Sequence, residues 1–265
     1  MAARPEGFSV IELLVVVAVI SVLAAALLPS LVGARDRARG VKCLSNLRQL
    51  GLAQSMYTGE FAGRVIPAAY TTARIIGNGP PVFWWGAMES DRIDHERGFV
   101  WPYLRSDLRE SGVFECPNQP WGSYAPQGLE TAITSTYGYN GYYLSPPHTP
   151  GWSSQISGRP WQTVERVGAP STVLAFGDSM LAWSEEHVTN TVLLDPPRVY
   201  AGNGRWTSNP HPTQSFRHAG RTGGVFMDGH AAQLAPRVAL RWPGAGVGAI
   251  TGDNDPYYVP DWRDW

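Results

Sequence analysis

The sequence contains few cysteines and few charged residues. Its 265 residues include two cysteines, Cys43 and Cys116, which form no C-x-x-C pair, and this argues against a zinc ribbon. Charged residues make up 16% of the chain and the formal net charge is −1, so the overall charge does not indicate nucleic-acid binding. The hydrolase and metallopeptidase motifs G-x-S-x-G and H-E-x-x-H are also absent from the sequence. Composition therefore favours none of these three classes.

Glycine, proline and aromatic residues are abundant instead. The chain has 29 Gly, 22 Pro, 11 Trp and 11 Tyr, a mixture typical of a loop-rich, extracytoplasmic globular domain. The tryptophans are spread along the chain and form no cluster that would select a sugar ligand. We therefore interpret most of them as core and loop anchors.

One long apolar run lies near the N-terminus. From Leu13 to Leu28 every residue except Ser21 is apolar, and the 25 residues from Phe8 to Val32 are long enough to cross a hydrocarbon core of about 30 Å. A cleaved secretory signal would have a shorter core followed by a small-residue site. A plain transmembrane anchor explains the length but leaves Glu12 unexplained.

The stretch GFSVIE resembles the processing site of type IV prepilins. Gly7, Phe8 and Glu12 occupy the positions of that motif behind the short leader MAARPEG, and Pro29 falls where many pilins carry a proline. The resemblance implies cleavage after Gly7 by a prepilin peptidase and N-methylation of Phe8. It also implies assembly with other pilin-like subunits, in a homo- or hetero-filament, on an inner-membrane assembly platform.

Glu12 has a physical explanation under this interpretation. Cleavage would leave an ammonium group on Phe8 in lipid, and an unpaired charge there is costly. A carboxylate four residues further on can neutralise that amine, in its own chain or in a neighbouring subunit. The alternative is that Glu12 reaches the lipid headgroups near the helix end.

Charges flanking the span conflict with the orientation that the resemblance implies. The prepilin interpretation places the N-terminus in the cytoplasm and the head in the periplasm, on a single-pass inner-membrane protein that later joins a periplasmic or surface filament. Residues 33–48, just after the span, include five basic residues and one acidic residue, Asp36. By the positive-inside rule this excess of positive charge favours the opposite orientation. We follow the motif because it is the more specific signal.

The sequence predicts an α+β fold of the pilin type. Beyond Pro29, which is expected to kink or locally melt the helix, apolar residues recur every three or four positions and predict an amphipathic stalk helix packed on an antiparallel β-sheet head. The residues of that face are Val41, Leu44, Leu47, Leu50 and Gln54. The predicted segments are a leader (1–7), a transmembrane and assembly helix (8–32), a stalk helix (33–62) and a β-rich periplasmic head (63–265).

Six stretches of the head read as short strands between turns. They are RVIPAAY (64–70), GVFECP (112–117), STYGYNGYYL (135–144), STVLAFGDSM (171–180), TVLLDPP (191–197) and GGVFMDGHAAQL (223–234). The polar residues 201–214 are expected to form a loop.

A second resemblance covers most of the chain. Five motifs occur in one order: CLSNLRQLGLAQSMY (43–57), ECP (115–117), YGYN (137–140), FGDS (176–179) and HAGRTGGVFMDG (218–229). In the last motif nine residues separate His218 from Asp228 and Gly229. The chain thus resembles the bacterial prepilin-like family named for its H-x9-DG signature. That family name does not imply an enzymatic activity.

His218, Asp228 and His230 are the residues that most suggest chemistry. One interpretation is a metal site or a His–Asp acid–base pair. The other is a structural hairpin in which a His–Asp hydrogen bond holds the turn and Gly229 supplies a positive φ. Because no nucleophile motif accompanies these residues, we expect the hairpin and predict no enzymatic activity.

A metal site elsewhere in the head is an open alternative. Asp178 ends a predicted buried strand, where a carboxylate usually caps backbone amides. Asp253 and Asp255 have a composition that suits calcium, which binds oxygen ligands on loops, although no EF-hand spacing is present. Pseudopilin heads often bind calcium, so the resemblance makes calcium the expected cofactor if the head holds one.

Cys43 and Cys116 are candidates for one disulfide. In an oxidising periplasm this bond would tie the stalk helix to the head. The bond would close a loop of 73 residues, which in the chain-entropy model stabilises the folded state by about 4 kcal/mol. Two separate buried thiols are the alternative.

These patterns favour a filament subunit. We expect a pilin-like or pseudopilin subunit of a type II secretion or type IV pilus-like system, with no nucleic-acid partner. Two alternatives are a membrane-anchored periplasmic enzyme or metal-binding protein that uses His218 and Asp228, and an adhesin displayed on a pilus.

Overall fold

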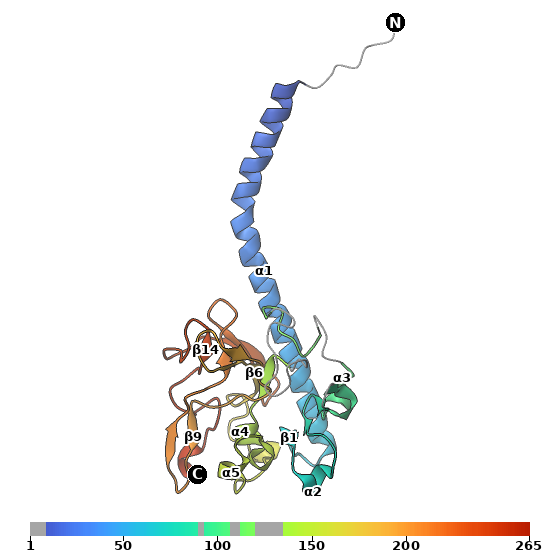
Figure 1. The fold of residues 1–265 in the computed structure, drawn as a ribbon, viewed down its shortest axis with the longest axis vertical. Coiled ribbons are helices and arrows are strands. Elements are labelled where there is room, and N and C mark those ends of the chain that lie inside the picture. The colour runs from blue at the N-terminus through green and yellow to red at the C-terminus, as the bar shows by residue number, and fades with distance from the viewer. Residues whose placement is uncertain (1–8, 90–92, 107–111, 120–134) are drawn as a thin grey trace. The chain divides into compact units, whose positions relative to one another are not determined.

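The computed structural model describes residues 9–89, 93–106, 112–119 and 135–265, with the side chains of residues 29, 30 and 32 left out. The chain divides into two compact units, residues 1–38 and residues 39–265. Helix α1 (Val10–Glu60) contributes to both units. Figure 1 shows the ribbon with the elements labelled.

In the first unit, α1 exposes a continuous apolar surface. Its described large apolar side chains between Val10 and Leu31 are 46–74% exposed. Among the described residues, α1 is the one helix long and apolar enough to cross a membrane, judged by length and composition. The helix continues through Pro29, so the local melting expected there is not observed.

In the second unit, one face of α1 is buried. Cys43, Leu47 and Leu50 are fully buried, and Gln54 and Tyr57 are nearly so, at helical spacing of three or four residues. Val41 is 69% exposed, so its predicted place on this face was wrong. The buried face begins instead at Gly40, where a Cβ would lie 2.5 Å from Gln233 Nε2. This close packing turns Val41 towards solvent.

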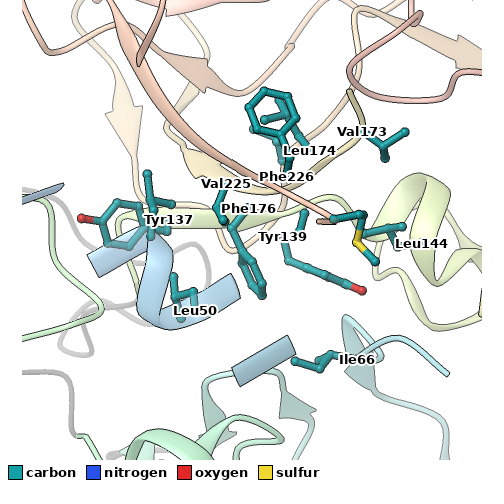
Figure 2. Packing of buried hydrophobic residues seen from close by; sticks show 14 of the residues in the cluster. Leu50, Ile66, Tyr137, Tyr139, Leu144, Val173, Leu174, Phe176, Val225 and Phe226 are labelled. Atoms are coloured by element: carbon teal, nitrogen blue, oxygen red, sulfur yellow. The ribbon is translucent and has the colours of Figure 1, made fainter. Parts of the chain in front are cut away.

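The central sheet has four antiparallel strands in the order β13-β12-β6-β5. Their bounds are Tyr137–Tyr139 for β5, Leu174–Asp178 for β6, Thr222–Phe226 for β12 and Ala231–Leu234 for β13. Strands β6 and β12 are buried along their whole length. Helix α1 approaches β12 at glycine: a Cβ on Gly223 would lie 2.8 Å from Leu47 Cδ1. Figure 2 labels Leu50 of α1 and Phe176, Tyr137 and Val225 of this sheet, which all belong to one cluster of buried residues.

Smaller elements surround this sheet. A second antiparallel sheet follows the order β1 (Ala69–Tyr70), β2 (Val82–Phe83), β3 (Gly86–Met88) and β4 (Ile93–Asp94). Three two-stranded pairs are β7 (Leu181–Ala182) with β8 (Val188–Thr189), β9 (Arg198–Tyr200) with β10 (Trp206–Ser208), and β11 (Gln214–Ser215) with β14 (Val247–Gly248). Short α-helices are α2 (Ala73–Ile76), α3 (Trp101–Leu104), α4 (Gly141–Leu144) and α5 (Ser153–Ile156). The 3-10 helices are η1 (His95–Arg97), η2 (Pro146–His148), η3 (Val164–Arg166) and η4 (Trp262–Asp264).

The predicted α+β class, a long N-terminal helix followed by antiparallel sheet, is confirmed. Several strand predictions were wrong in detail. GVFECP forms turns, TVLLDPP makes only an isolated bridge from Leu193 to Tyr139, and RVIPAAY is a strand only at its last two residues. The predicted loop at 201–214 contains β10, because Trp206 to Ser208 pair with β9. Short apolar runs alone do not specify whether a partner strand is present.

Candidate functional site

The N-terminal motif forms a helix cap. Ser9 N donates to Glu12 Oε2 at 2.8 Å, and Glu12 N donates to Ser9 Oγ at 3.2 Å. This reciprocal pair is a capping box at the start of α1. Gly7 and Phe8 lie outside the described residues, so the predicted pairing of Glu12 with the Phe8 amine stays a prediction. A carboxylate accepts several hydrogen bonds, so capping and that pairing are compatible.

The head holds a buried group of four side chains with metal-ligand chemistry. One ligand atom from each of Cys43, Cys116, Asp178 and His218 lies within 4.8 Å of the other three. Cys43 comes from α1, Cys116 from a loop, Asp178 from the end of β6 and His218 from the turn before β12. Both cysteines and the aspartate are fully buried, and His218 is 4% exposed. We refer to these four residues as the buried cluster.

Direct contacts within the buried cluster are short. Cys43 Sγ donates to Asp178 Oδ1 at 3.3 Å, while His218 Nε2 lies 3.2 Å from both Cys116 Sγ and Asp178 Oδ2. A single ring nitrogen thus faces the sulfur and the carboxylate together. In a catalytic Cys–His–Asp triad the imidazole uses one nitrogen for each partner. The arrangement is therefore one of converging ligands rather than of a proton relay.

Neighbouring groups fix the carboxylate of Asp178. Gly223 N donates to its Oδ2 at 2.6 Å, and Arg217 Nε lies 3.8 Å from its Oδ1. Arg217 Nη2 in turn donates to the carbonyl oxygens of Thr136 and Ser179, at 3.1 and 2.6 Å. A Cβ on Gly223 would lie 3.0 Å from Asp178 Oδ2, so the glycine permits the close approach of β12.

The imidazole of His218 is held from its other side. Asn118 Nδ2 lies 3.1 Å from His218 Nδ1 and donates to Arg217 O, also at 3.1 Å. The backbone of His218 pairs with Arg221 across a tight turn. This turn belongs to the H-x9-DG segment and directs the ring towards the sulfur atoms.

Electrostatics in the buried cluster favour a charged pair. Burial raises the pKa of Cys116, but its contacts with Cys43 and His218 and the charge of Arg217 outweigh it and lower the value to about 6. Burial lowers the pKa of His218, whereas Asp178 and Cys116 raise it to about 10. For Cys43, burial and its contacts with Cys116 and Asp178 hold the pKa well above the usual range. The directions of these two shifts favour the ionised form of Cys116 and the protonated form of His218.

The structure separates His218 from its predicted partner. The carboxylate that contacts His218 belongs to Asp178, whereas Asp228 Oδ1 lies 2.6 Å from His230 Nδ1, with both side chains more than one-third exposed. Gly229 has a φ of 88°, as expected of the residue that follows β12 and Asp228. The expected hydrogen bond of the hairpin is therefore made by Asp228 with His230.

Two further candidate carboxylates lie on the surface. Asp253 Oδ1 pairs with Arg198 Nε at 2.5 Å, and Asp255 Oδ2 pairs with Arg263 Nη1 at 3.2 Å. Each carboxylate faces its own guanidinium group, and within the described part of the chain neither joins a group of three potential ligands. Calcium in the head therefore stays an untested prediction.

Cys43 and Cys116 are free thiols in the structure. Their sulfur atoms lie within 4.8 Å of each other, inside the buried cluster. The predicted disulfide stays a prediction, and its two partners share their surroundings with Asp178 and His218.

Sequence reasoning found the four residues but not their convergence. Four of the five motifs that resemble the H-x9-DG family each supply one residue of the buried cluster. The fifth motif, YGYN, contains Tyr137, which is not in the cluster and whose hydroxyl lies 3.4 Å from Asn46 Nδ2 on α1. The available signal was that each motif contained a residue able to bind a metal or carry charge. Because Asp228 is the carboxylate nearest to His218 in the sequence, the pattern suggested Asp228 as its partner instead of Asp178.

Comparison with known proteins supports one part of the resemblance. Residues 3–28 match the family model described as the prokaryotic N-terminal methylation motif. No curated protein and no solved structure matches the chain significantly. The match supports a type IV pilin-like precursor, and the apolar helix fits a membrane-anchored protein of this class. The finer resemblance to the H-x9-DG family stays a prediction.

Proposed function

We propose that this chain is the precursor of a filament subunit in a type II secretion or type IV pilus-like system. A prepilin peptidase cleaves it after Gly7, Phe8 is N-methylated, and residues 8–32 bundle with the same segment of neighbouring subunits. The observation that carries the proposal is the methylation-motif match at residues 3–28. The exposed apolar surface of α1 supports it, because such a surface needs lipid or other helices around it.

In this proposal the role of the protein is mechanical rather than enzymatic. The N-terminal helix forms the filament core, and the head makes lateral contacts on the periplasmic side. Nearly complete burial of the cluster supports this assignment, since a substrate would have no access to Cys116 or His218.

Glu12 is the residue that distinguishes assembly from simple anchoring. Its structural contact is the capping box with Ser9, and its proposed partner in the filament is the Phe8 amine. Glu12→Gln keeps an oxygen acceptor for the Ser9 amide but removes the charge. Ser9→Ala removes the hydroxyl of the cap and leaves the charge in place. The pair of variants therefore separates the two roles.

The test uses the full chain in cells that contain a prepilin peptidase and an assembly platform. Filaments are sheared, sedimented and quantified for wild type, Glu12→Gln and Ser9→Ala. We expect filament yield to fall more than about tenfold in Glu12→Gln, the order expected when a charge in lipid loses its partner, and to remain near wild type in Ser9→Ala. Wild-type yield from Glu12→Gln would overturn the role of the charge, and a wild-type chain that never sediments as filament would overturn the proposed function.

A further inference from the structure

The buried cluster has the ligands, charge and geometry of a closed metal site. We propose that Cys43, Cys116, Asp178 and His218 bind one zinc ion that fastens the C-terminal part of α1 to the central sheet. The inference stands on the head alone and does not depend on filament assembly.

Ligand type selects the metal. Thiolate, imidazole and carboxylate are all ligand types that zinc binds, and four of them match its usual coordination number, whereas calcium requires oxygen ligands. All four side chains are at least 96% buried, as expected of a structural site with no open position for water.

The spacing of the ligand atoms fits a tetrahedron. Zinc bonds of about 2.3 Å to sulfur and about 2.0–2.1 Å to nitrogen or oxygen place ligand atoms roughly 3.3–3.8 Å apart. The Cys43–Asp178, Cys116–His218 and His218–Asp178 contacts measure 3.2–3.3 Å, at or just below the lower end of that range. The remaining pairs fall within 4.8 Å, so small side-chain movements complete the coordination sphere.

Charge is balanced when the ion is bound. Zinc takes thiolates and a neutral imidazole as ligands. Two thiolates and the Asp178 carboxylate then balance the ion and Arg217, whose Nε lies 3.8 Å from Asp178 Oδ1.

A second layer of contacts supports the ligand roles. Gly223 N and Arg217 orient Asp178, as metal-bound carboxylates usually require. With zinc on Nε2, His218 keeps its proton on Nδ1, which faces Asn118. Asn118 Oδ1 is buried and has no hydrogen-bond partner in the described part of the chain. A half-turn of this amide would let that oxygen accept the Nδ1 proton, in exchange for the hydrogen bond that Nδ2 donates to Arg217 O.

A disulfide between Cys43 and Cys116 is the competing use of the same sulfur atoms. It needs neither Asp178 nor His218, whereas zinc needs all four residues. Matched pairs of variants exploit this difference: Asp178→Asn is compared with Asp228→Asn, and His218→Gln with His230→Gln. Asp228 and His230 are the exposed carboxylate and imidazole of the same segment.

The experiment uses the full chain purified in detergent, without chelator and without reductant. Metal content is measured by elemental analysis, and thiols are counted by intact mass. Apo protein is then titrated with Co²⁺, whose thiolate coordination gives charge-transfer and visible d–d bands. We expect one zinc per chain, two titratable thiols after metal removal, and cobalt bands that are lost in Asp178→Asn and His218→Gln but kept in both controls. Removal of zinc is expected to lower the thermal midpoint of the head.

The proposal is overturned if the purified wild type carries a Cys43–Cys116 disulfide and, once reduced, binds neither Zn²⁺ nor Co²⁺. It is also overturned if cobalt binding survives in folded Asp178→Asn and His218→Gln variants. If these variants fail to fold, the metal content, thiol count and cobalt spectra of the wild-type protein still test the proposal, because these measurements require no substitution.

Discussion

The two parts of helix α1 differ in what surrounds their apolar side chains. Between Val10 and Leu31 the described large apolar side chains are 46–74% exposed, whereas Leu47 and Leu50 are fully buried against the head. The first part is apolar all around the helix, and the second buries one face and exposes another. A helix that is apolar on all sides requires lipid or other helices. The second part already has its partner within the chain, so only the first part depends on an environment outside the protein.

The largest expected effect on stability comes from emptying the helix–sheet contact. Leu47→Ala removes a fully buried side chain that lies against Gly223 and is expected to destabilise the head by about 2–5 kcal/mol. Leu14→Ala, in the apolar part of the same helix, is the matched control because Leu14 is 63% exposed. Thermal unfolding in detergent, followed by near-UV circular dichroism, measures both. Equal thermal unfolding midpoints for Leu47→Ala and Leu14→Ala would contradict the difference in packing between the two parts of α1.

A smaller effect is expected from filling the close approach at Gly51. A Cβ there would lie 2.7 Å from Val225 Cγ2, so Gly51→Ala is expected to cost about 1–3 kcal/mol through overpacking. Gly59→Ala is the control, since no atom within 4 Å meets a Cβ at that exposed position of the same helix. In the control, alanine is expected to stabilise by about 0.5–1 kcal/mol, the helix propensity gained over glycine. Chemical denaturation compares the two, and a stabilising Gly51→Ala would show that the helix does not pack on β12 as described.

The third effect depends on pH and concerns Asp195, a half-buried residue that belongs to the head only. Burial raises its pKa to about 7, partly opposed by the hydrogen bond that Trp152 Nε1 donates to it at 2.8 Å. The protonated acid is therefore favoured on folding, and this contribution is lost as pH rises from the ordinary value towards about 7. Asp195→Asn is expected to flatten the decline of the thermal midpoint between about pH 4 and about pH 7. An unchanged slope would contradict the raised pKa.

Sequence patterns predicted the first part of α1 more completely than the head. Gly7, Phe8, Glu12 and the apolar run form a contiguous signal, and length alone predicts a helix that can span a bilayer. The helix begins at Val10, close to the predicted start at residue 8, because its start depends only on local capping residues and apolar content. Val41 was misplaced because the buried face depends on where the small residues Gly40 and Cys43 let the sheet approach.

The buried cluster was harder to predict because its members are far apart in the sequence. Cys43 and Asp178 are separated by 135 positions, and Cys116 and His218 by 102. Their meeting depends on the antiparallel pairing of β6 with β12 and on the packing of α1, neither of which leaves a local pattern. Asp228 is close to His218 in sequence, yet it follows the end of β12, and its carboxylate pairs with exposed His230.

We propose that the N-terminal segment is a processed assembly element rather than a permanent anchor. Its most direct test is the mass and sequence of the N-terminal peptide of the chain isolated from cells with a prepilin peptidase. We predict that it begins at Phe8 carrying an N-methyl group, that Gly7→Val prevents the cleavage, and that Gly33→Val, where no atom lies within 4 Å of the added Cβ, leaves it unaffected. A membrane-bound chain that still begins at Met1 in those cells would contradict the account.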